Sequence, residues 1–402
     1  MLHTGLFRKV FDSIPLMSLK RSSAMMKSEI VLLVIIGLGT LAVWVWQRWY
    51  SVASGPPQPE QSRQTKTPSV QPLSVPEISA YANFEAVRTA LAATTTPDIA
   101  RKELDELRRY LSTLPSEAAV GAIRQFLDSK QDAPSGLGFT IGSEGFLTAA
   151  PSLRVFLLDY LSRLDRQAAS RYAETILGSM DSPDEWAVSL RNYAMANSTP
   201  DARAFLERKM QELLRYEPWQ KNPSTGYLEA FDVSVHSGGT NLMPALTQLV
   251  RQQDNPAVAH AAYLALDRLT ISNPAATLEH LLNYPDAMRG REQTRANYFA
   301  RADITDPQQR QILENYLLAP DRSAAELQTF SGIFPNANFM VSHNLLTRTA
   351  TPDGATLTRD DREALEVVEG WVRNERFSRL RSALEKIRER LQSFVQPAPR
   401  DR

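Results

Sequence analysis

Side chains that could carry out catalysis gather in one stretch, residues 219–241 (WQKNPSTGYLEAFDVSVHSGGTN). Within it, Asp232, Ser234 and His236 bring together a carboxylate, a hydroxyl and an imidazole, the groups from which a nucleophile and its base are built. No nucleophile-elbow motif accompanies them, and proximity in sequence does not provide triad geometry. We interpret the stretch as a long polar loop that could contact a ligand or partner, because long ordered loops are disproportionately functional. The residues predicted for that contact are Asp232, His236, Ser237, Gly238 and Gly239.

A second stretch, SGLGFTIGSEGF at residues 135–146, contains four closely spaced glycines, as phosphate-binding loops do. A dinucleotide fingerprint needs a strand before its first glycine and a helix that opens at its last. Here Gly136 follows a polar turn, the next helix is predicted near Pro151, and no Gly-Lys-Ser/Thr of a Walker loop occurs. Apolar and polar residues alternate on either side of a Gly-Ser-Glu-Gly turn, which favours a small β-hairpin insertion near 136–148. An anion-binding nest and a nucleotide site are the alternatives.

Acidic residues in the same two stretches suggest a different chemistry. Glu144 and Glu229 could line a groove as the two carboxylates of a glycosidase, which would have to lie about 5–10 Å apart. His260 and His280 fall within predicted helices without a second ligand at metal spacing, and no H-E-x-x-H motif is present. We therefore predict no catalytic residue, no metal and no cofactor.

The charge of the chain argues against nucleic acid as a partner. Its 402 residues include 45 Lys and Arg and 45 Asp and Glu, so no net field favours a polyanion, and any electrostatic partner depends on local patches. The absence of cysteine excludes disulfides, thiolate nucleophiles and cysteine-based metal sites.

A strongly apolar segment near the N-terminus predicts a membrane span. Residues 30–46 (IVLLVIIGLGTLAVWVW) carry no charge and would extend about 26 Å as a helix, close to the thickness of the hydrocarbon layer. We predict a signal-anchor transmembrane helix at 29–50 after a short basic cytoplasmic tail at 1–28, with contact to the lipid bilayer through residues 30–46. The aromatic residues predicted at the membrane interface are Trp44, Trp46, Trp49 and Tyr50.

These features place the protein in the cytoplasmic (inner) membrane as a single-pass protein, with its N-terminus inside and its bulk in the periplasm or extracellular. A cleaved signal peptide is the alternative, since Ser51, Val52 and Ala53 could form a small-x-small cleavage site. Residues 51–77 are rich in proline, serine and glutamine, a composition that cannot bury enough apolar surface to fold. We predict a disordered spacer there.

From residue 78 to residue 359 the pattern predicts an all-α domain of short helices. Each unit starts with Pro, Asp, Asn or Ser, continues with an apolar residue every three or four positions, and ends at another break. In the unit TPDIARKELDELRRYLSTL, the apolar residues predicted on one face are Ile99, Leu104, Leu107 and Leu111. Breaks this short imply antiparallel neighbouring helices.

The segment DNPAVAHAAYLALDRL at residues 254–269 resembles the second helix of a HEAT or armadillo-type repeat, in which small residues let helices approach closely. The resemblance implies a HEAT-like solenoid, an α-helical repeat array with an extended binding surface, and it implies no catalytic residues. An irregular helical bundle is the alternative.

The last predicted element is a long amphipathic helix over residues 360–396, followed by a disordered tail at 397–402. Its apolar seam consists of Phe377, Leu380, Leu384, Ile387, Leu391 and Phe394. The seam is shorter than three heptads, so it predicts either a helix docked against the array or self-association through residues 377–394.

Taken together, the sequence predicts a membrane-anchored, extracytoplasmic helical-repeat scaffold or adaptor that binds another protein of the cell envelope and is not an enzyme. The physical reason is that stacked helices present an extended surface without a deep polar cleft. The alternative is an envelope hydrolase acting on cell-wall or carbohydrate polymer.

Overall fold

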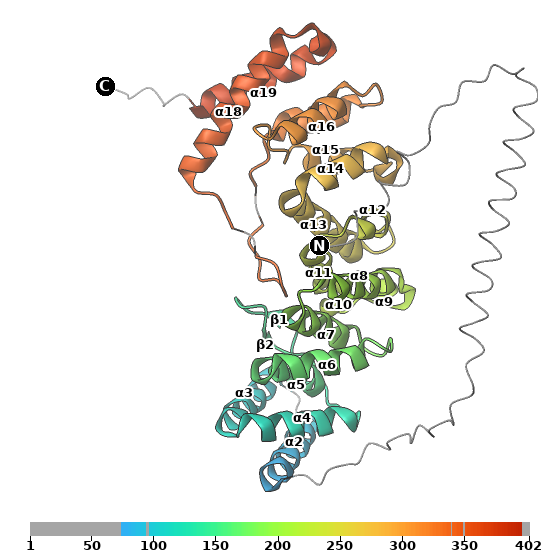
Figure 1. The fold of residues 1–402 in the computed structure, drawn as a ribbon, viewed down its shortest axis with the longest axis vertical. Helices are drawn as coiled ribbons and strands as arrows, with labels where there is room; N and C mark the ends of the chain where they lie inside the picture. Colours follow the sequence, from blue (N-terminus) through green and yellow to red (C-terminus); the bar gives the residue numbers. More distant parts are fainter. Residues whose placement is uncertain (1–73, 94–95, 339, 349, 396–402) are drawn as a thin grey trace, which may run out of the picture. The chain divides into compact units, whose positions relative to one another are not determined.

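The computed structural model describes residues 74–93, 96–338, 340–348 and 350–395. The chain divides into two units, Met1–Gln71 and Pro72–Arg402, and every described residue belongs to the second. That unit is built almost entirely of helices, with one small two-stranded sheet (Figure 1).

The first half of the unit contains the sheet and the helices around it. Its elements are α2 (Val75–Ala93), α3 (Pro97–Thr113), α4 (Ser116–Asp128), β1 (Thr140–Ile141), β2 (Leu147–Ala149), α5 (Leu153–Leu164), α6 (Arg166–Ile176), α7 (Pro183–Ala196), α8 (Pro200–Arg215), α9 (Glu217–Lys221), α10 (Thr225–Glu229) and α11 (Asp232–Ser237).

The second half of the unit continues with helices only. Its elements are η1 (Thr240–Leu242), α12 (Met243–Val250), α13 (Pro256–Ser272), α14 (Pro274–Asn283), η2 (Pro285–Met288), α15 (Glu292–Phe299), α16 (Pro307–Leu318), α17 (Ala324–Ile333), α18 (Gly354–Arg373), η3 (Glu375–Leu380) and α19 (Arg381–Val395).

Many helices begin where the sequence supplies a capping residue followed by proline. The side chains of Ser182, Thr199, Asn255 and Asp306 each accept a hydrogen bond from the first turn of the helix that follows. Proline is well suited to the next position because the first turn leaves its N–H groups without intrahelical partners. The start signals read from the sequence are therefore confirmed at these helices.

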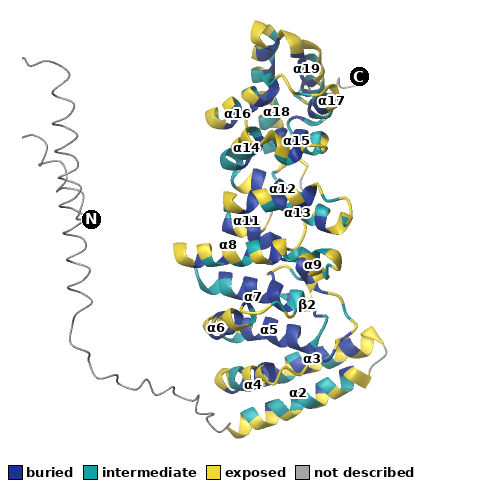
Figure 2. Ribbon diagram, turned by 90° about the vertical axis from the view of Figure 1, so that its right-hand side faces the viewer, coloured by how far each residue is buried: buried dark blue, intermediate teal, exposed yellow. Residues whose placement is uncertain are grey.

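Successive helices pack on one another in chain order within the unit. Contacts join α4 to α5, α6 to α7, α7 to α8, α11 to α13, α13 to α14, α14 to α16 and α15 to α17. Figure 2 shows the buried residues on the helix sides that face these neighbours. The apolar side chains form one continuous core cluster from Ala80 to Leu391. This is the arrangement expected of an array in which no helix pair buries its apolar face alone.

In α3 the inward face differs by one position from the predicted one. Leu104, Leu107 and Leu111 are buried as predicted, but Ile99 is 49 % exposed and Ala100 takes its place in the core. Ala100, Leu104, Leu107 and Leu111 follow the spacing of four, three and four that keeps residues on one side of a helix. Ile99 lies one position outside that stripe.

The predicted hairpin is present between α4 and α5. β1 and β2 pair in antiparallel orientation, with Thr140 opposite Ala149 and Ile141 opposite Leu147. The turn between them closes through a hydrogen bond of 2.8 Å from Gly142 N to Phe146 O. The four glycines therefore form a tight turn and its approaches.

Residues 219–241, interpreted from the sequence as a loop, form the end of α9 and the short helices α10, α11 and η1. Ser224 caps α10, and Gly238 ends α11 with a left-handed backbone, φ 63°. Helices of five or six residues are too short to display an apolar period, which is why the pattern did not predict them.

The C-terminal segment consists of two helices, where the sequence pattern predicts one over 360–396. The chain turns at Asn374, whose side chain caps the short η3 helix that leads into α19. α18 and α19 pack on each other, and α19 also contacts α17. Of the six seam residues, five are buried and Phe394 is 58 % exposed. The seam is therefore largely used inside the chain, and self-association through 377–394 stays a prediction.

The predicted transmembrane helix requires a correction. No helix in the described part of the chain combines the length and the apolar character needed to cross a bilayer. The longest, α18, has 20 residues and carries charged side chains along its length. Residues 29–50, which include Trp44, Trp46, Trp49 and Tyr50, lie outside the described residues. The membrane-spanning part of the predicted fold and the single-pass inner-membrane location, with bilayer contact through residues 30–46, are contradicted by this finding.

Candidate functional site

An extended segment crosses one side of the helical array between α17 and α18. We call it the strap: residues 335–347, apart from Phe339, which lies outside the described residues. Figure 1 shows the chain leaving α17, running along the array as far as the β-hairpin, and returning to α18. The strap contains no helix or strand. What holds it is a set of polar contacts with the helices it passes.

Asp232, at the first position of α11, holds the far end of the strap. Its Oδ2 accepts hydrogen bonds from the backbone N–H groups of Leu346 at 2.8 Å and Thr347 at 2.9 Å, and its Oδ1 accepts one from the Thr347 hydroxyl. The Asp232 side chain is only 1 % exposed. A buried carboxylate that accepts several charge-assisted hydrogen bonds is a strong and directional contact.

Arg268, on α13, links Asp232 to the middle of the strap. Its Nη1 lies 3.3 Å from Asp232 Oδ1, and its Nη2 donates to the Ser342 hydroxyl at 2.9 Å. The Ser342 hydroxyl in turn contacts Asn344 Oδ1 at 2.9 Å. One arginine therefore joins two neighbouring helices of the array to the segment that lies over them.

Arg301, immediately after α15, holds the near end of the strap. Its Nη2 donates to the Asn338 carbonyl at 2.7 Å, and its Nη1 donates to the Asn336 carbonyl at 3.3 Å. The same guanidinium pairs with both oxygens of Asp267, at 2.5 and 2.8 Å. Because Asp267 adjoins Arg268 on α13, neighbouring positions of one helix take part in two successive ion pairs.

A third pair of the same kind holds the hairpin. Arg191 on α7 is fully buried, and its Nη1 contacts Asp159 Oδ1 of α5 at 2.5 Å and donates to the Gly145 carbonyl at 2.9 Å. Asp159 Oδ1 also accepts from the Leu147 backbone N–H at 3.0 Å. The guanidinium of Arg191 further lies 4.8 Å from the centre of the Phe146 ring. The hairpin is thus bound through its backbone, like the strap.

We call the three pairs Asp159–Arg191, Asp232–Arg268 and Asp267–Arg301 the polar ladder. Their partners are separated by 32, 36 and 34 positions in the sequence. The pairs join α5 to α7, α11 to α13, and α13 to the chain that follows α15. In each pair the arginine or the acid also binds backbone groups of a segment that crosses the array.

The hairpin and the strap meet at Gly145. A side-chain Cβ at this position would lie 2.3 Å from the Leu345 carbonyl oxygen, and the backbone has φ +80°, so both space and conformation require glycine. Leu345 is 2 % exposed and Asn344 6 %, which makes them the buried anchor of the strap. The glycine stretch thus forms part of the surface on which the strap packs.

The serine, histidine and aspartate of α11 do not form a catalytic triad. Asp232 is occupied by the strap and Arg268, and the Ser237 hydroxyl donates to the Ser234 carbonyl at 3.0 Å. The Ser234 hydroxyl is buried without a hydrogen-bond partner among the described residues, so no base activates it. Desolvation lowers the pKa of His236, an effect that the nearby Asp232 partly offsets.

The two glycines of the predicted contact loop have structural roles. Gly238 ends α11, and its carbonyl accepts a hydrogen bond from Asn273 Nδ2 at 3.1 Å. At Gly239 a Cβ would lie 2.2 Å from Glu207 Oε1. Of the residues predicted for ligand contact, the structure therefore brings only Asp232 into direct contact with an extended segment.

Glu144 and Glu229 both lie near the region where the strap ends. Glu144 is exposed in the hairpin turn next to Gly145, and Glu229 is half-buried on α10. Burial raises the pKa of Glu229; the charge of Arg268 opposes this effect and that of Asp232 adds to it. The strap, seated between Gly145 and Asp232, occupies this part of the array.

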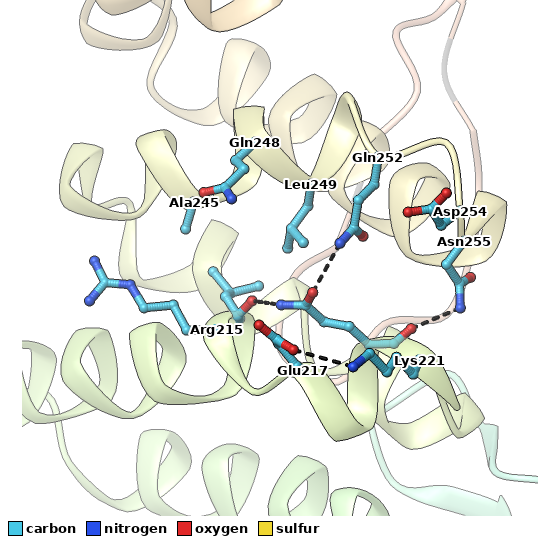
Figure 3. Close-up of a pocket in the computed structure, with 11 residues that line it drawn as sticks. Arg215, Glu217, Lys221, Ala245, Gln248, Leu249, Gln252, Asp254 and Asn255 are labelled. Carbon is cyan, nitrogen blue, oxygen red and sulfur yellow. Dashed lines mark hydrogen bonds and ion pairs between the residues drawn. The ribbon is translucent and has the colours of Figure 1, made fainter.

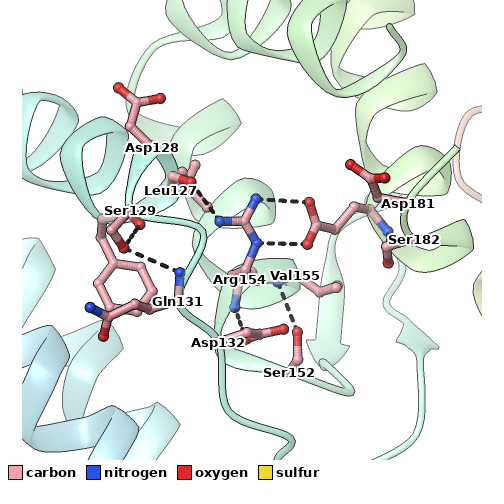
Figure 4. A network of polar contacts seen from close by, with 12 residues as sticks. Leu127, Asp128, Ser129, Gln131, Asp132, Ser152, Arg154, Val155, Asp181 and Ser182 are labelled. Atoms are coloured by element: carbon pink, nitrogen blue, oxygen red, sulfur yellow. Dashed lines mark hydrogen bonds and ion pairs between the residues drawn. The ribbon is translucent and has the colours of Figure 1, made fainter. Parts of the chain in front are cut away.

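A further buried ion pair, Arg154–Glu185, joins helices in the first half of the unit. Arg154 on α5 pairs with both oxygens of Glu185 on α7 at 2.7 and 3.0 Å, and its Nη1 donates to the Leu127 carbonyl at the end of α4 at 2.6 Å (Figure 4). Its backbone N–H donates to Asp132. Through these contacts the guanidinium of Arg154 connects α4, α5 and α7.

A pocket of about 460 Å³ lies between α9 and α12 and is lined mainly by polar side chains (Figure 3). Gln252 donates to Gln220 Oε1 at 3.0 Å, Gln220 donates to the Leu214 carbonyl at 2.6 Å, and Asn255 donates to the Gln220 carbonyl at 2.8 Å. These amides bind one another across the joint between two helical units. In the described part of the chain, no group of three His, Asp or Glu side chains is arranged to hold a metal ion.

Comparison of the chain with protein-family models, with curated proteins and with solved structures gave no match. The resemblance of residues 254–269 to HEAT and armadillo-type repeats therefore stays a prediction.

The arginines of the ladder were not predicted as functional residues from the sequence. The available signal is an acid next to an arginine on a predicted helix, as in the Asp267-Arg268 pair within LALDRL. A single Asp-Arg pair on a helix is indistinguishable from a solvated surface pair, and only the packing of the units shows that it is buried.

Proposed function

We propose that this protein is a non-catalytic scaffold that binds another protein through the side of the array that carries the polar ladder. The observation that carries the proposal is that this side already binds an extended stretch of polypeptide, residues 336–338 and 340–347, through backbone groups. Backbone carbonyl and N–H groups are present in every polypeptide, so a surface that binds them can bind a segment of another protein.

The electrostatics of the ladder support a binding role. A lone buried carboxylate or guanidinium would be strongly destabilising, whereas each ladder charge is paired with its opposite, and in each pair at least one partner makes further hydrogen bonds to a crossing segment. Asp232 keeps its second oxygen for two backbone N–H groups, and Arg301 keeps two N–H donors for backbone carbonyls. The array is thus prepared to bind both kinds of backbone group.

Site-specific photo-crosslinking tests the proposal. A photoreactive amino acid at Glu144, which is exposed beside the strap seat, is compared with one at Ile99, which is 49 % exposed on α3. We expect one protein to crosslink from position 144 and not from position 99, and the purified protein to bind the purified scaffold with one-to-one stoichiometry. Crosslinks to the same proteins from both positions, or no saturable binding after purification, would contradict the proposal.

A further inference from the structure

We infer that two pairs of the polar ladder, Asp232–Arg268 and Asp267–Arg301, form a docking site for an extended, uncharged polypeptide segment. The strap is its intramolecular occupant, and a partner binds by placing its own segment where the strap lies. The inference rests on the proposed function, because it specifies the chemistry and the mode of the partner's contact. The composition of the strap, the nature of its contacts and its burial each bear on it.

The composition of the strap defines the chemistry of the partner segment. Residues 336–347, NANFMVSHNLLT, contain no Lys, Arg, Asp or Glu, in a chain of which 22 % of residues are charged. The charges of the ladder already neutralise one another in pairs. A charged side chain on the bound segment that faced the ladder would therefore be buried without a partner. We therefore expect a segment rich in amide, hydroxyl and aliphatic side chains, as the strap is.

The contacts of the strap define the spacing of the partner's backbone groups. Arg301 binds the carbonyls of Asn336 and Asn338, and the Ala300 carbonyl accepts from the Asn336 N–H at 2.7 Å. Asp232 binds the N–H groups of Leu346 and Thr347. Since these partners are backbone groups, a segment of different sequence can make the same contacts, provided that it is extended and about as long.

In the described part of the strap, the side chains that are buried or hydrogen-bonded to Asp232 and Arg268 belong to residues 342–347. Leu345 and Asn344 are buried, and the hydroxyls of Ser342 and Thr347 contact Arg268 and Asp232. A competing segment therefore needs an aliphatic residue at the position of Leu345. It also needs a small hydroxyl residue two places further on.

The burial of the strap favours its exchange. Among the described residues in the middle of the strap, Met340 is 52 % exposed and Val341 71 %, so these two side chains add little apolar burial to its binding. At its root, a cavity of about 430 Å³ is lined by Pro335, Asn336 and Ala337 together with α18 residues such as Leu357 and Asp361. Segments with little buried apolar surface open more readily than the elements they cover.

Binding of the strap peptide in trans tests the inference. The probe is a fluorescent peptide of residues 335–347, PNANFMVSHNLLT, and the receptor is the full chain with residues 336–347 replaced by a Gly-Ser sequence of equal length. We expect saturable binding measured by anisotropy, at least tenfold tighter than to the unmodified chain, where the strap competes. Asp232→Asn in the replaced background should weaken binding of the peptide at least tenfold, and a scrambled peptide should not bind.

A second variant covers the case in which the replaced chain does not fold. A protease site is inserted between Met340 and Val341, which are exposed, and the strap is cut after folding. The cut chain should bind the peptide and the uncut chain should bind it at least tenfold more weakly. Equal affinity for cut and uncut chains, or no binding to a cut chain that keeps its helical circular dichroism, would overturn the inference.

The peptide-binding experiments and the crosslinking experiment can fail independently of each other. Peptide binding together with a failure of crosslinking at position 144 would leave the docking site standing and remove the scaffold proposal. A crosslinked partner that binds equally well to chains with and without the strap would leave the scaffold proposal standing and remove the exchange of segments.

Discussion

The hairpin and the strap are two segments held by the same chemistry on the same array, and they differ in how far along the chain their binding residues lie. Leu147 and Gly145 are bound by residues 12 and 46 positions away, whereas Leu346 is bound by Asp232 at a distance of 114 positions. Arg191 is fully buried beneath the hairpin, and the Arg268 side chain is 16 % exposed beneath the strap.

This difference in sequence separation and burial indicates which of the two segments can detach from the array without unfolding it. The hairpin is closed by the helices directly before and after it, so its release disrupts the packing of α4 on α5 and of α5 on α7. The strap is hydrogen-bonded to Asp232, Arg268 and Arg301, which lie on or next to helices that pack directly on one another. Opening of the strap should therefore be a local event with a free energy below that of global unfolding.

Arg191→Met should have the largest effect on stability. The substitution leaves Asp159 buried with one remaining arginine, the partly exposed Arg163 at 3.5 Å, and removes the donor to the Gly145 carbonyl. We expect a loss of about 3–5 kcal/mol in the free energy of unfolding, measured with urea. Arg163→Ala, which removes a partly exposed partner of the same acid, is the control and should cost less than about 1 kcal/mol. A loss as small as that of the control would show that the hairpin is not fixed by this pair.

Asp232→Asn should release the strap and spare the hairpin. The amide can offer one neutral acceptor in place of two charged ones, so the N–H groups of Leu346 and Thr347 lose their charge-assisted hydrogen bonds. We expect amide hydrogen exchange at Leu346 and Thr347 to accelerate at least tenfold, with exchange at Leu147 unchanged. Equal acceleration at all three amides would mean that the two segments open together.

Ser342→Ala should have a smaller effect of the same kind. It removes the hydrogen bond of 2.9 Å from Arg268, together with the local contact of the same hydroxyl with Asn344 inside the strap, and leaves the buried anchor at Leu345 in place. A net value of about 0.5–1 kcal/mol for such a bond corresponds to about two- to five-fold faster exchange at Leu346. Val341→Ala, at an exposed neighbouring position, should leave the exchange rate unchanged.

Glu229→Gln should have the smallest effect and the opposite sign at neutral pH. Because burial raises the pKa of Glu229, its contribution to stability is present below its unfolded-state pKa and is lost as the pH rises through its folded-state pKa. Relative to the glutamine variant, the parent chain should therefore become less stable between pH 4 and pH 7, by less than about 1 kcal/mol. A pH-independent difference between the two chains, measured by urea unfolding, would contradict this assignment.

The helices and the hairpin could be predicted from the sequence because their signals are local. Capping residues followed by proline predict helix starts, and the alternation around the Gly-Ser-Glu-Gly turn predicts β1 and β2. The strap could not be predicted, since residues 335–347 show no period and their hydrogen-bond partners lie up to 115 positions away. The sequence indicates Asp232 as a candidate contact residue because it lies close to Ser234 and His236. Its actual partners, Arg268 and Thr347, are far from it in the sequence and reach it only through the packing of the helices.

The strap is connected to the array at both of its ends, and this sets the minimum affinity that a competing segment must have. The chain enters the strap from α17 and returns from it to α18, and both helices pack on α19. A displaced strap consequently stays close to its seat, at an effective concentration on the order of millimolar for a short flexible tether. A partner present at micromolar concentration must bind the ladder about a thousandfold more tightly than the free strap sequence does, so segments of ordinary affinity are rejected by simple competition.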